Sequence, residues 1–148
     1  MNILHINDYE AIIARINSLS ENSQKMWGKM TVSQMIEHCI RPFQVALGEL
    51  KLKKTLVGIL FGGLAKKSFL SGKPMAKNLP TDKSFIVKSN PTLENAKQQL
   101  LEYIKKFIDM DKNELEARIH PFFGKMTSDE WGKLFALHLD HHLKQFGV

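Results

Sequence analysis

The C-terminal stretch of the chain, residues 131–148, places two histidines in the middle of an apolar helical stripe. Its apolar residues recur with the period of an α-helix and fall within one arc of roughly 120°. His138 and His142 lie inside this arc and not at its polar edge. Buried imidazoles need partners for their ring nitrogens, because an unpaired buried polar group costs about 1–3 kcal/mol. A bound metal ion is one partner that serves both histidines at once.

Amphipathic segments along the rest of the chain predict an all-α protein built as a four-helix bundle. Two of the four long segments begin with a capping box, Thr31 with Gln34 and Thr127 with Glu130. Asp8 is the expected N-cap of the first helix, and the Asn-Pro pair at residues 90–91 marks the start of the third. A short extra helix is expected between the second and third long helices, and no stretch shows the alternation of a strand. The expected helices cover residues 8–19, 31–50, about 54–68, 91–110 and 127–146.

Length and composition predict a single domain over residues 1–148. Cys39 is the only cysteine, so an internal disulfide is impossible, and the first residues lack the pattern of a secretion signal. We therefore expect a cytoplasmic protein. The longest apolar run, residues 56–65, is much shorter than the roughly 20 residues that a membrane-spanning helix needs, so no membrane span is expected.

Positive charge is concentrated in residues 51–90, which contain nine lysines and one acidic residue, Asp82. We call this stretch the lysine-rich segment. It can attract an anionic small molecule, nucleic acid or a membrane surface, or it can be a solvated connector. Nucleic-acid binding is the weakest of these, because the segment has no arginine and no regular aromatic interleaving. The connection is long for a bundle, so it is expected to cover an opening or to contact a partner subunit, and its apolar residues 56–64 favour a homodimer.

A third histidine, His38, is predicted to reach the pair on the last helix. It lies seven residues after the start of the second expected helix, and Leu139, between His138 and His142, lies seven residues before Phe146 near the end of the last one. If these helices are antiparallel, a rise of about 1.5 Å per residue brings all three histidines to one level. Three imidazoles with an open coordination position are typical of a catalytic metal site, and zinc, nickel and iron(II) all tolerate such ligands. The HxxxH pair alone also fits a solvated pair or one satisfied within the core.

Three further side chains are candidates for supporting this site. Gln34 lies one turn before His38 and either orients its ring or faces solvent. Gln145 lies one turn beyond His142 and either binds a water molecule beside the ion or sits at a fraying helix end. His141 points to the helix flank, where it is exposed or adjacent to the ligands. Core positions are expected for Cys39 and for both tryptophans, Trp27 and Trp131.

These residues resemble the DinB-like, YfiT-like superfamily of metalloproteins, and within it a poorly characterised subgroup. The matching stretches are WGKMTVSQMIEH at 27–38, HPFFGKMTSDEWGKL at 120–134 and HLDHHLKQFG at 138–147. The resemblance implies a four-helix bundle with up-down-down-up connections and a divalent metal ion held by His38, His138 and His142. Better-known relatives are transferases and isomerases that use bacillithiol, mycothiol or glutathione, so the resemblance also implies a low-molecular-weight thiol and S-transferase-like activity.

Two classes of function follow. One is a metal-dependent enzyme that attaches a thiol to an electrophile or hydrolyses a small molecule with metal-bound water, and the lysine-rich segment suits an anionic substrate. The other is a non-catalytic metal-binding bundle that acts in stress response or protein interaction.

Overall fold

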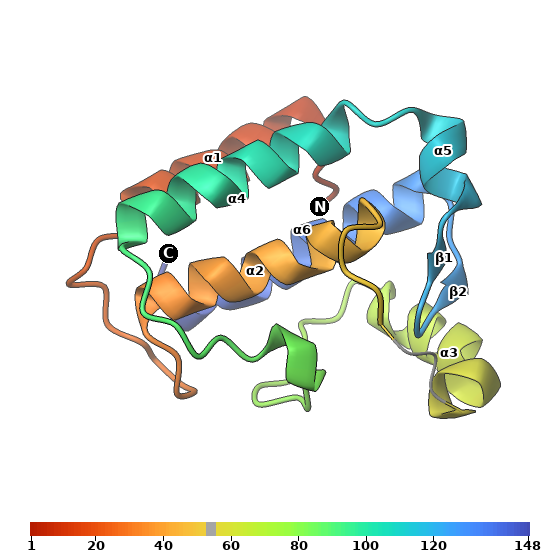
Figure 1. Ribbon diagram of the computed structural model, residues 1–148, viewed down its shortest axis with the longest axis horizontal. Coiled ribbons are helices and arrows are strands. Elements are labelled where there is room, and N and C mark those ends of the chain that lie inside the picture. The colour runs from red at the N-terminus through yellow and green to blue at the C-terminus, as the bar shows by residue number, and fades with distance from the viewer. Residues whose placement is uncertain (53–55) are drawn as a thin grey trace.

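The computed structural model describes residues 1–52 and 56–148, with side chains for residues 1–52 and 61–148. In these ranges it is mainly helical, which confirms the expected all-α class (Figure 1). The long helices are α1 (Ile6–Ser18), α2 (Val32–Ala46), α4 (Leu93–Ile108) and α6 (Ser128–Gln145). The remaining elements are α3 (Leu56–Phe69), a 3-10 turn η1 (Lys83–Phe85), α5 (Lys112–Ala117), and a hairpin of β1 (Ile119–His120) with β2 (Gly124–Lys125).

The four long helices contact one another in a closed ring, in which α1 and α2 each pack against both α4 and α6. Asn2, just before α1, bonds to Asp129 at the start of α6, and Arg15 near the end of α1 bonds to Asp140 further along α6. Helices α1 and α6 therefore run in the same direction. Figure 1 shows α2 running opposite to α6, which is the relative direction that the histidine prediction required.

Aromatic packing fixes the level of α2 against α6. The ring of Phe43 on α2 stacks on that of Phe135 on α6 with 4.2 Å between centroids, and Phe107 of α4 meets Phe135 edge-on at 4.5 Å. All three side chains are almost fully buried. Burying one large apolar side chain contributes about 1.5–3 kcal/mol, so a shift of one helix along another would be costly. The register that places the histidines is held by this cluster.

Two of the predicted helix starts are confirmed and two are wrong. Both capping boxes form, with Thr31 and Thr127 as the N-caps of α2 and α6. Asp8 does not cap α1, which begins earlier at Ile6, because its carboxylate instead accepts a hydrogen bond from the backbone amide of Asn2. The cap of α4 is Thr92 and not Asn90, whose side-chain oxygen accepts from Gln34 on α2.

The region between α2 and α4 contains the predicted extra helix, as α3. Its expected start at residue 54 lies outside the described residues, and its observed end at Phe69 agrees with the prediction. The chain then passes beside α2 through η1 before it enters α4 (Figure 1). The short α5 and the hairpin were not predicted. Among the described residues, no helix combines the length and apolarity needed to span a membrane.

Candidate metal centre

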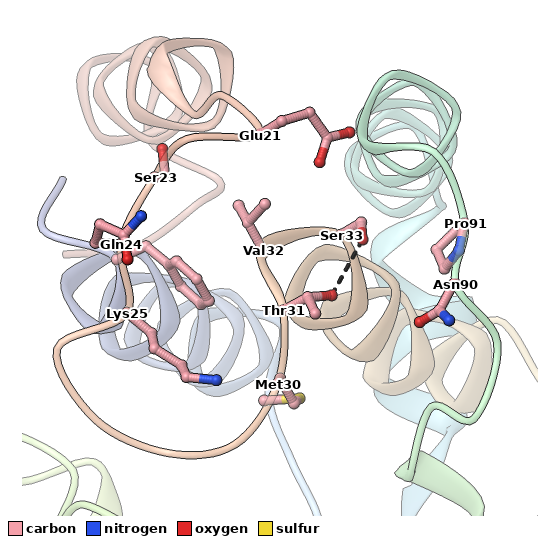
Figure 2. Close-up of a pocket in the computed structure, with 11 residues that line it drawn as sticks. Glu21, Ser23, Gln24, Lys25, Met30, Thr31, Val32, Ser33, Asn90 and Pro91 are labelled. Atoms are coloured by element: carbon pink, nitrogen blue, oxygen red, sulfur yellow. Dashed lines mark hydrogen bonds between the residues drawn. The ribbon is translucent and has the colours of Figure 1, made fainter.

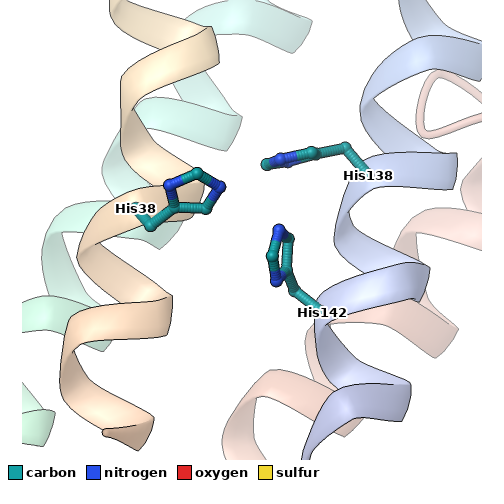
Figure 3. A group of neighbouring side chains, drawn as sticks. All are labelled: His38, His138 and His142. Atoms are coloured by element: carbon teal, nitrogen blue, oxygen red, sulfur yellow. The ribbon is translucent and has the colours of Figure 1, made fainter. Parts of the chain in front are cut away.

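His38 of α2 and His138 and His142 of α6 point their rings toward one another (Figure 3). The ring centroids are 5.3 Å apart for His38 and His138, 4.7 Å for His38 and His142, and 4.6 Å for the pair on α6. One ring nitrogen from each histidine lies within 4.8 Å of the other two. The structure thus brings together the three histidines that the helical register selected.

His38 is oriented by a backbone carbonyl group from the lysine-rich segment. Its Nδ1 lies 3.0 Å from the carbonyl oxygen of Phe85, at the end of η1. A carbonyl oxygen can only accept, so Nδ1 carries the hydrogen and Nε2 of the neutral ring keeps its lone pair. A hydrogen bond from the second nitrogen to a carbonyl oxygen is the usual way in which proteins orient a metal-binding histidine.

His142 is oriented in the same way by a side chain. Its Nδ1 lies 2.9 Å from Oε1 of Gln145, while Nε2 of that glutamine donates to the carbonyl oxygen of Trp27 at 2.9 Å. The contact with Trp27 fixes which end of the amide is the donor, so Oε1 must accept from His142. Nε2 of His142 is therefore left with its lone pair. Gln145 is 3% exposed and does not occupy a fraying surface position.

The bend around Trp27 leaves no room beside Gln145 for a larger residue than glycine. Gly28 has a φ of +80°, and a Cβ atom at this position would lie 2.3 Å from Nε2 of Gln145. The backbone amide of Met26 also donates to the carbonyl oxygen of Gln145 at 2.8 Å. The loop between α1 and α2 therefore holds the end of α6 and, through Gln145, the ring of His142.

Burial keeps the three imidazoles in the neutral form. Burial lowers the pKa of His142 to about 3, with a smaller contribution from the nearby His38. It also lowers the pKa of His38, although the hydrogen bond to Phe85 opposes the effect. The pKa of His138 lies well below its ordinary value because of burial and the proximity of the other two rings. Neutral imidazole is the form that binds metal ions.

The donor set fits a divalent ion. Two imidazole nitrogens bound to one tetrahedral ion at about 2.1 Å each lie about 3.4 Å apart. Because the three nitrogens already lie within 4.8 Å of one another, each pair needs to close by at most about 1.4 Å. A set of three neutral nitrogens suits zinc, nickel or iron(II) and is a poor match for magnesium or calcium, which prefer oxygen ligands.

Comparison with known proteins identifies the family of the chain. Residues 1–147 match the family described as "Protein of unknown function (DUF1569)". The chain belongs to the DUF1569 family. No curated protein and no solved structure matches it. The function of this DUF1569 protein must therefore be argued from the site itself.

Of the two other predicted supporting residues, His141 lies beside the centre and Gln34 does not. Gln34 completes the capping box of α2 and donates to Asn90, so its amide is engaged away from the ring nitrogens of His38. His141 is half-buried on the flank of α6, with its ring centroid 5.1 Å from that of His142 and 5.6 Å from that of Trp27. His141 thus separates the three histidines from the Trp27 ring.

The predicted core positions of this DUF1569 protein are confirmed in two cases out of three. Trp131 and Cys39 are each 1% exposed, and burial raises the pKa of the cysteine thiol, which argues against thiolate chemistry there. Trp27 is only half-buried and lines a small cavity. Its backbone is tied to Gln145, which places the ring at the surface of α6 and not within the core.

The larger cavity, of about 550 Å³, lies where α2 begins and does not include the three histidines (Figure 2). Its polar walls are already engaged in the fold. Thr31 caps α2, and the carboxylate of Glu21 accepts a hydrogen bond from the backbone amide of Leu93. Most residues that line this cleft are polar, but none is a histidine or a cysteine, so the histidine cluster remains the site with distinctive chemistry.

Proposed function

We propose that this DUF1569 protein binds one divalent metal ion through His38, His138 and His142 and uses it to catalyse a reaction of a small molecule. One observation carries the proposal. His38 and His142 each bond through Nδ1 to a carbonyl oxygen, which leaves Nε2 of each ring with its lone pair, and the three rings face a shared centre (Figure 3). Histidines that served packing alone would be expected to satisfy one another by pairing a donor with an acceptor.

We further propose that the fold is the up-down-down-up four-helix bundle of DinB-like proteins. The ring of contacts among α1, α2, α4 and α6 supports it, as does the common direction of α1 and α6. In such bundles metal sites are built from side chains of facing helices, as His38 and the pair on α6 are here.

Three protein ligands leave a coordination position for a reactant, which distinguishes catalytic from structural sites. A bound divalent ion supplies Lewis acidity that favours the ionised form of a thiol or a water molecule. The chain's own part is to hold the ligand rings: Phe85 orients His38, and Gln145 orients His142. Resemblance to DinB-like transferases favours a low-molecular-weight thiol as co-substrate and S-transferase-like chemistry, with hydrolysis as the second reaction type.

The position of the lysine-rich segment favours an anionic substrate, because this segment contacts the metal centre directly. Phe85 belongs to this segment and bonds to His38, and the segment carries nine lysines with one acidic residue. Positive charge next to a reaction centre raises the local concentration of anions. We propose that the protein acts in the cytoplasm on such a molecule.

A non-catalytic metal-binding bundle is the second candidate. The exposed apolar side chains Phe61 and Leu64 of α3, at 57% and 73% exposure, favour it because they suit a protein contact such as a homodimer. Both candidate functions require the metal ion, but only the enzyme would convert a substrate.

The test uses full-length protein loaded separately with zinc, nickel or iron(II). Each form is incubated with bacillithiol, mycothiol or glutathione and a chromogenic electrophile. We expect turnover that depends on the metal and is lost in His38→Ala, whereas His5→Ala, which removes an exposed histidine outside the centre, retains it. Equal activity of His38→Ala and wild type would contradict the enzyme proposal. Metal binding without turnover would favour the non-catalytic bundle.

A further inference from the structure

A second, smaller cavity of about 140 Å³ lies on the flank of α6, beside the metal centre. Pockets for drug-sized ligands measure roughly 300–1,000 Å³, so this one fits a small molecule or one end of a larger one. Its walls come from the loop between α1 and α2, from residues 74–77 of the lysine-rich segment, and from α6. They include the apolar side chains of Trp27, Met75 and Leu137, the ring of His141, and three charged residues, Lys77, Lys144 and Asp140.

The cavity is connected to the metal centre through two residues. The ring of Trp27 forms one wall, while its backbone oxygen accepts from Gln145, the residue that orients His142. His141 lies between the cavity and the centre, 5.6 Å from Trp27 and 5.1 Å from His142 by ring centroid. A molecule in the cavity is therefore separated from a proposed metal ligand by a single side chain.

The cavity walls carry two lysines, Lys77 and Lys144, and one carboxylate, Asp140, so positive charge is in excess. Lys144 bonds to one carboxylate oxygen of Asp140 at 2.8 Å, but the other oxygen is bound by Arg15 at 2.9 Å, so two cations share one carboxylate. Lys77 adds a second ammonium group to the walls, with Nζ 4.4 Å from the centroid of the Trp27 ring. Within the described ranges, no ion pair includes Lys77.

The remaining walls are apolar or aromatic, which defines the rest of the ligand. Trp27 offers part of its ring, and Met75 and Leu137 offer apolar side chains. A charged head alone would leave these surfaces in contact with water, whereas an apolar stem would bury them. Small sites of this kind usually combine an apolar lining with a few polar groups that fix the orientation of the ligand.

We propose that this cavity binds the carboxylate end of a small organic acid, with the carboxylate near Lys77 and the apolar stem against Trp27 and Leu137. The inference extends the proposed function, because the cavity lies on the helix that carries His138 and His142, and His141, which lines it, is adjacent to His142. Binding in the cavity itself depends on the lysines and on Trp27, and it does not require the ion.

The experiment uses full-length protein containing 5-fluorotryptophan, with and without bound zinc. The chain has two tryptophans, so the fluorine spectrum has two resonances, and Trp27→Phe assigns them. The probes are 3-phenylpropionate and its neutral amide, which have nearly the same shape. We expect the carboxylate to shift the Trp27 resonance saturably and the amide to bind at least about fivefold more weakly, because a lost charge contact is worth about that factor.

A matched pair of variants tests the role of Lys77. Lys77→Gln is expected to weaken binding of 3-phenylpropionate by about fivefold. Lys88→Gln removes the same charge from an exposed position of the same segment outside the cavity and should bind like wild type. Equal binding of the acid and the amide, unaltered binding by Lys77→Gln, or the lack of a saturable shift would each overturn the inference. Zinc content, measured on the same samples, reports separately on the proposed function.

Discussion

Nδ1 of His142 donates a hydrogen bond of 2.9 Å to Oε1 of Gln145, three residues further along the last helix. The amide of this glutamine is held in turn by the carbonyl oxygen of Trp27, which is 118 positions away in the sequence. The orientation of a proposed metal ligand therefore depends on a loop from the other end of the chain. Disturbance of that loop should weaken the metal centre without touching a ligand.

Replacement of Gln145 by alanine should lower metal affinity by about 10–100-fold, the usual effect of removing the partner that orients a metal-binding histidine. Zinc affinity can be measured by competition with a chromophoric chelator. Gln145→Glu should retain more affinity than Gln145→Ala, because a carboxylate still accepts from Nδ1 of His142. Gln99→Ala, at an exposed position of α4, serves as control. Wild-type affinity in Gln145→Ala would show that the hydrogen bond does not matter.

Gly28→Ala should destabilise the protein more than Gly72→Ala does. The two glycines have nearly equal φ angles, +80° and +81°, but an added Cβ would meet Gln145 at Gly28 and nothing within 4 Å at Gly72. Both variants lose about 1–2 kcal/mol from backbone strain alone. Only Gly28→Ala should lose further free energy of unfolding, in denaturant titrations, and also zinc affinity. An equal loss of unfolding free energy in the two variants would mean that the loop around Gly28 accommodates the added Cβ atom without strain.

Local signals made much of the fold predictable. The capping boxes at Thr31 and Thr127 satisfy helix ends within four residues of chain, so their patterns were sufficient. The six residues of α5 and the two-residue strands of the hairpin are too short to show a period. Asp8 has the residue type of a cap but bonds to Asn2, a contact outside any helix pattern.

The proposed ligands were predictable, and of the groups that support them only Gln145 was. His138 and His142 follow from helical spacing, and His38 follows from the register of two antiparallel helices. The groups that orient the rings include the carbonyl oxygens of Phe85 and Trp27, which every residue type carries. The sequence does not indicate which backbone carbonyl oxygens will contact a given side chain, so only the fold could identify these two.

His120 should make the protein less stable in acid. Burial lowers its pKa from 6.5 to about 4, and its Nδ1 accepts hydrogen bonds from the backbone amides of Phe122 and Phe123, which a protonated ring cannot do. The unfolded chain therefore binds a proton at a higher pH than the folded one. Stability from this source is complete above pH 6.5 and falls as the pH drops to about 4, by at most about 3 kcal/mol.

Substitution of His120 by asparagine isolates this contribution. Asparagine offers a side-chain oxygen to the same two amides and does not titrate. Urea denaturation at pH 7.5 and at pH 4.5 should show a smaller loss of stability for His120→Asn than for wild type. The same loss in both proteins would assign the acid sensitivity to other groups.

The metal content of untagged, full-length protein tests the central proposal most directly. After incubation with excess zinc and removal of free ions, elemental analysis should find about one ion per chain in wild type and in the control His5→Ala. His138→Ala removes one of three ligands and should retain far less, with circular dichroism used to confirm that it remains folded. Wild-type protein without bound metal, or a folded His138→Ala with the same content as wild type, would contradict the proposed centre.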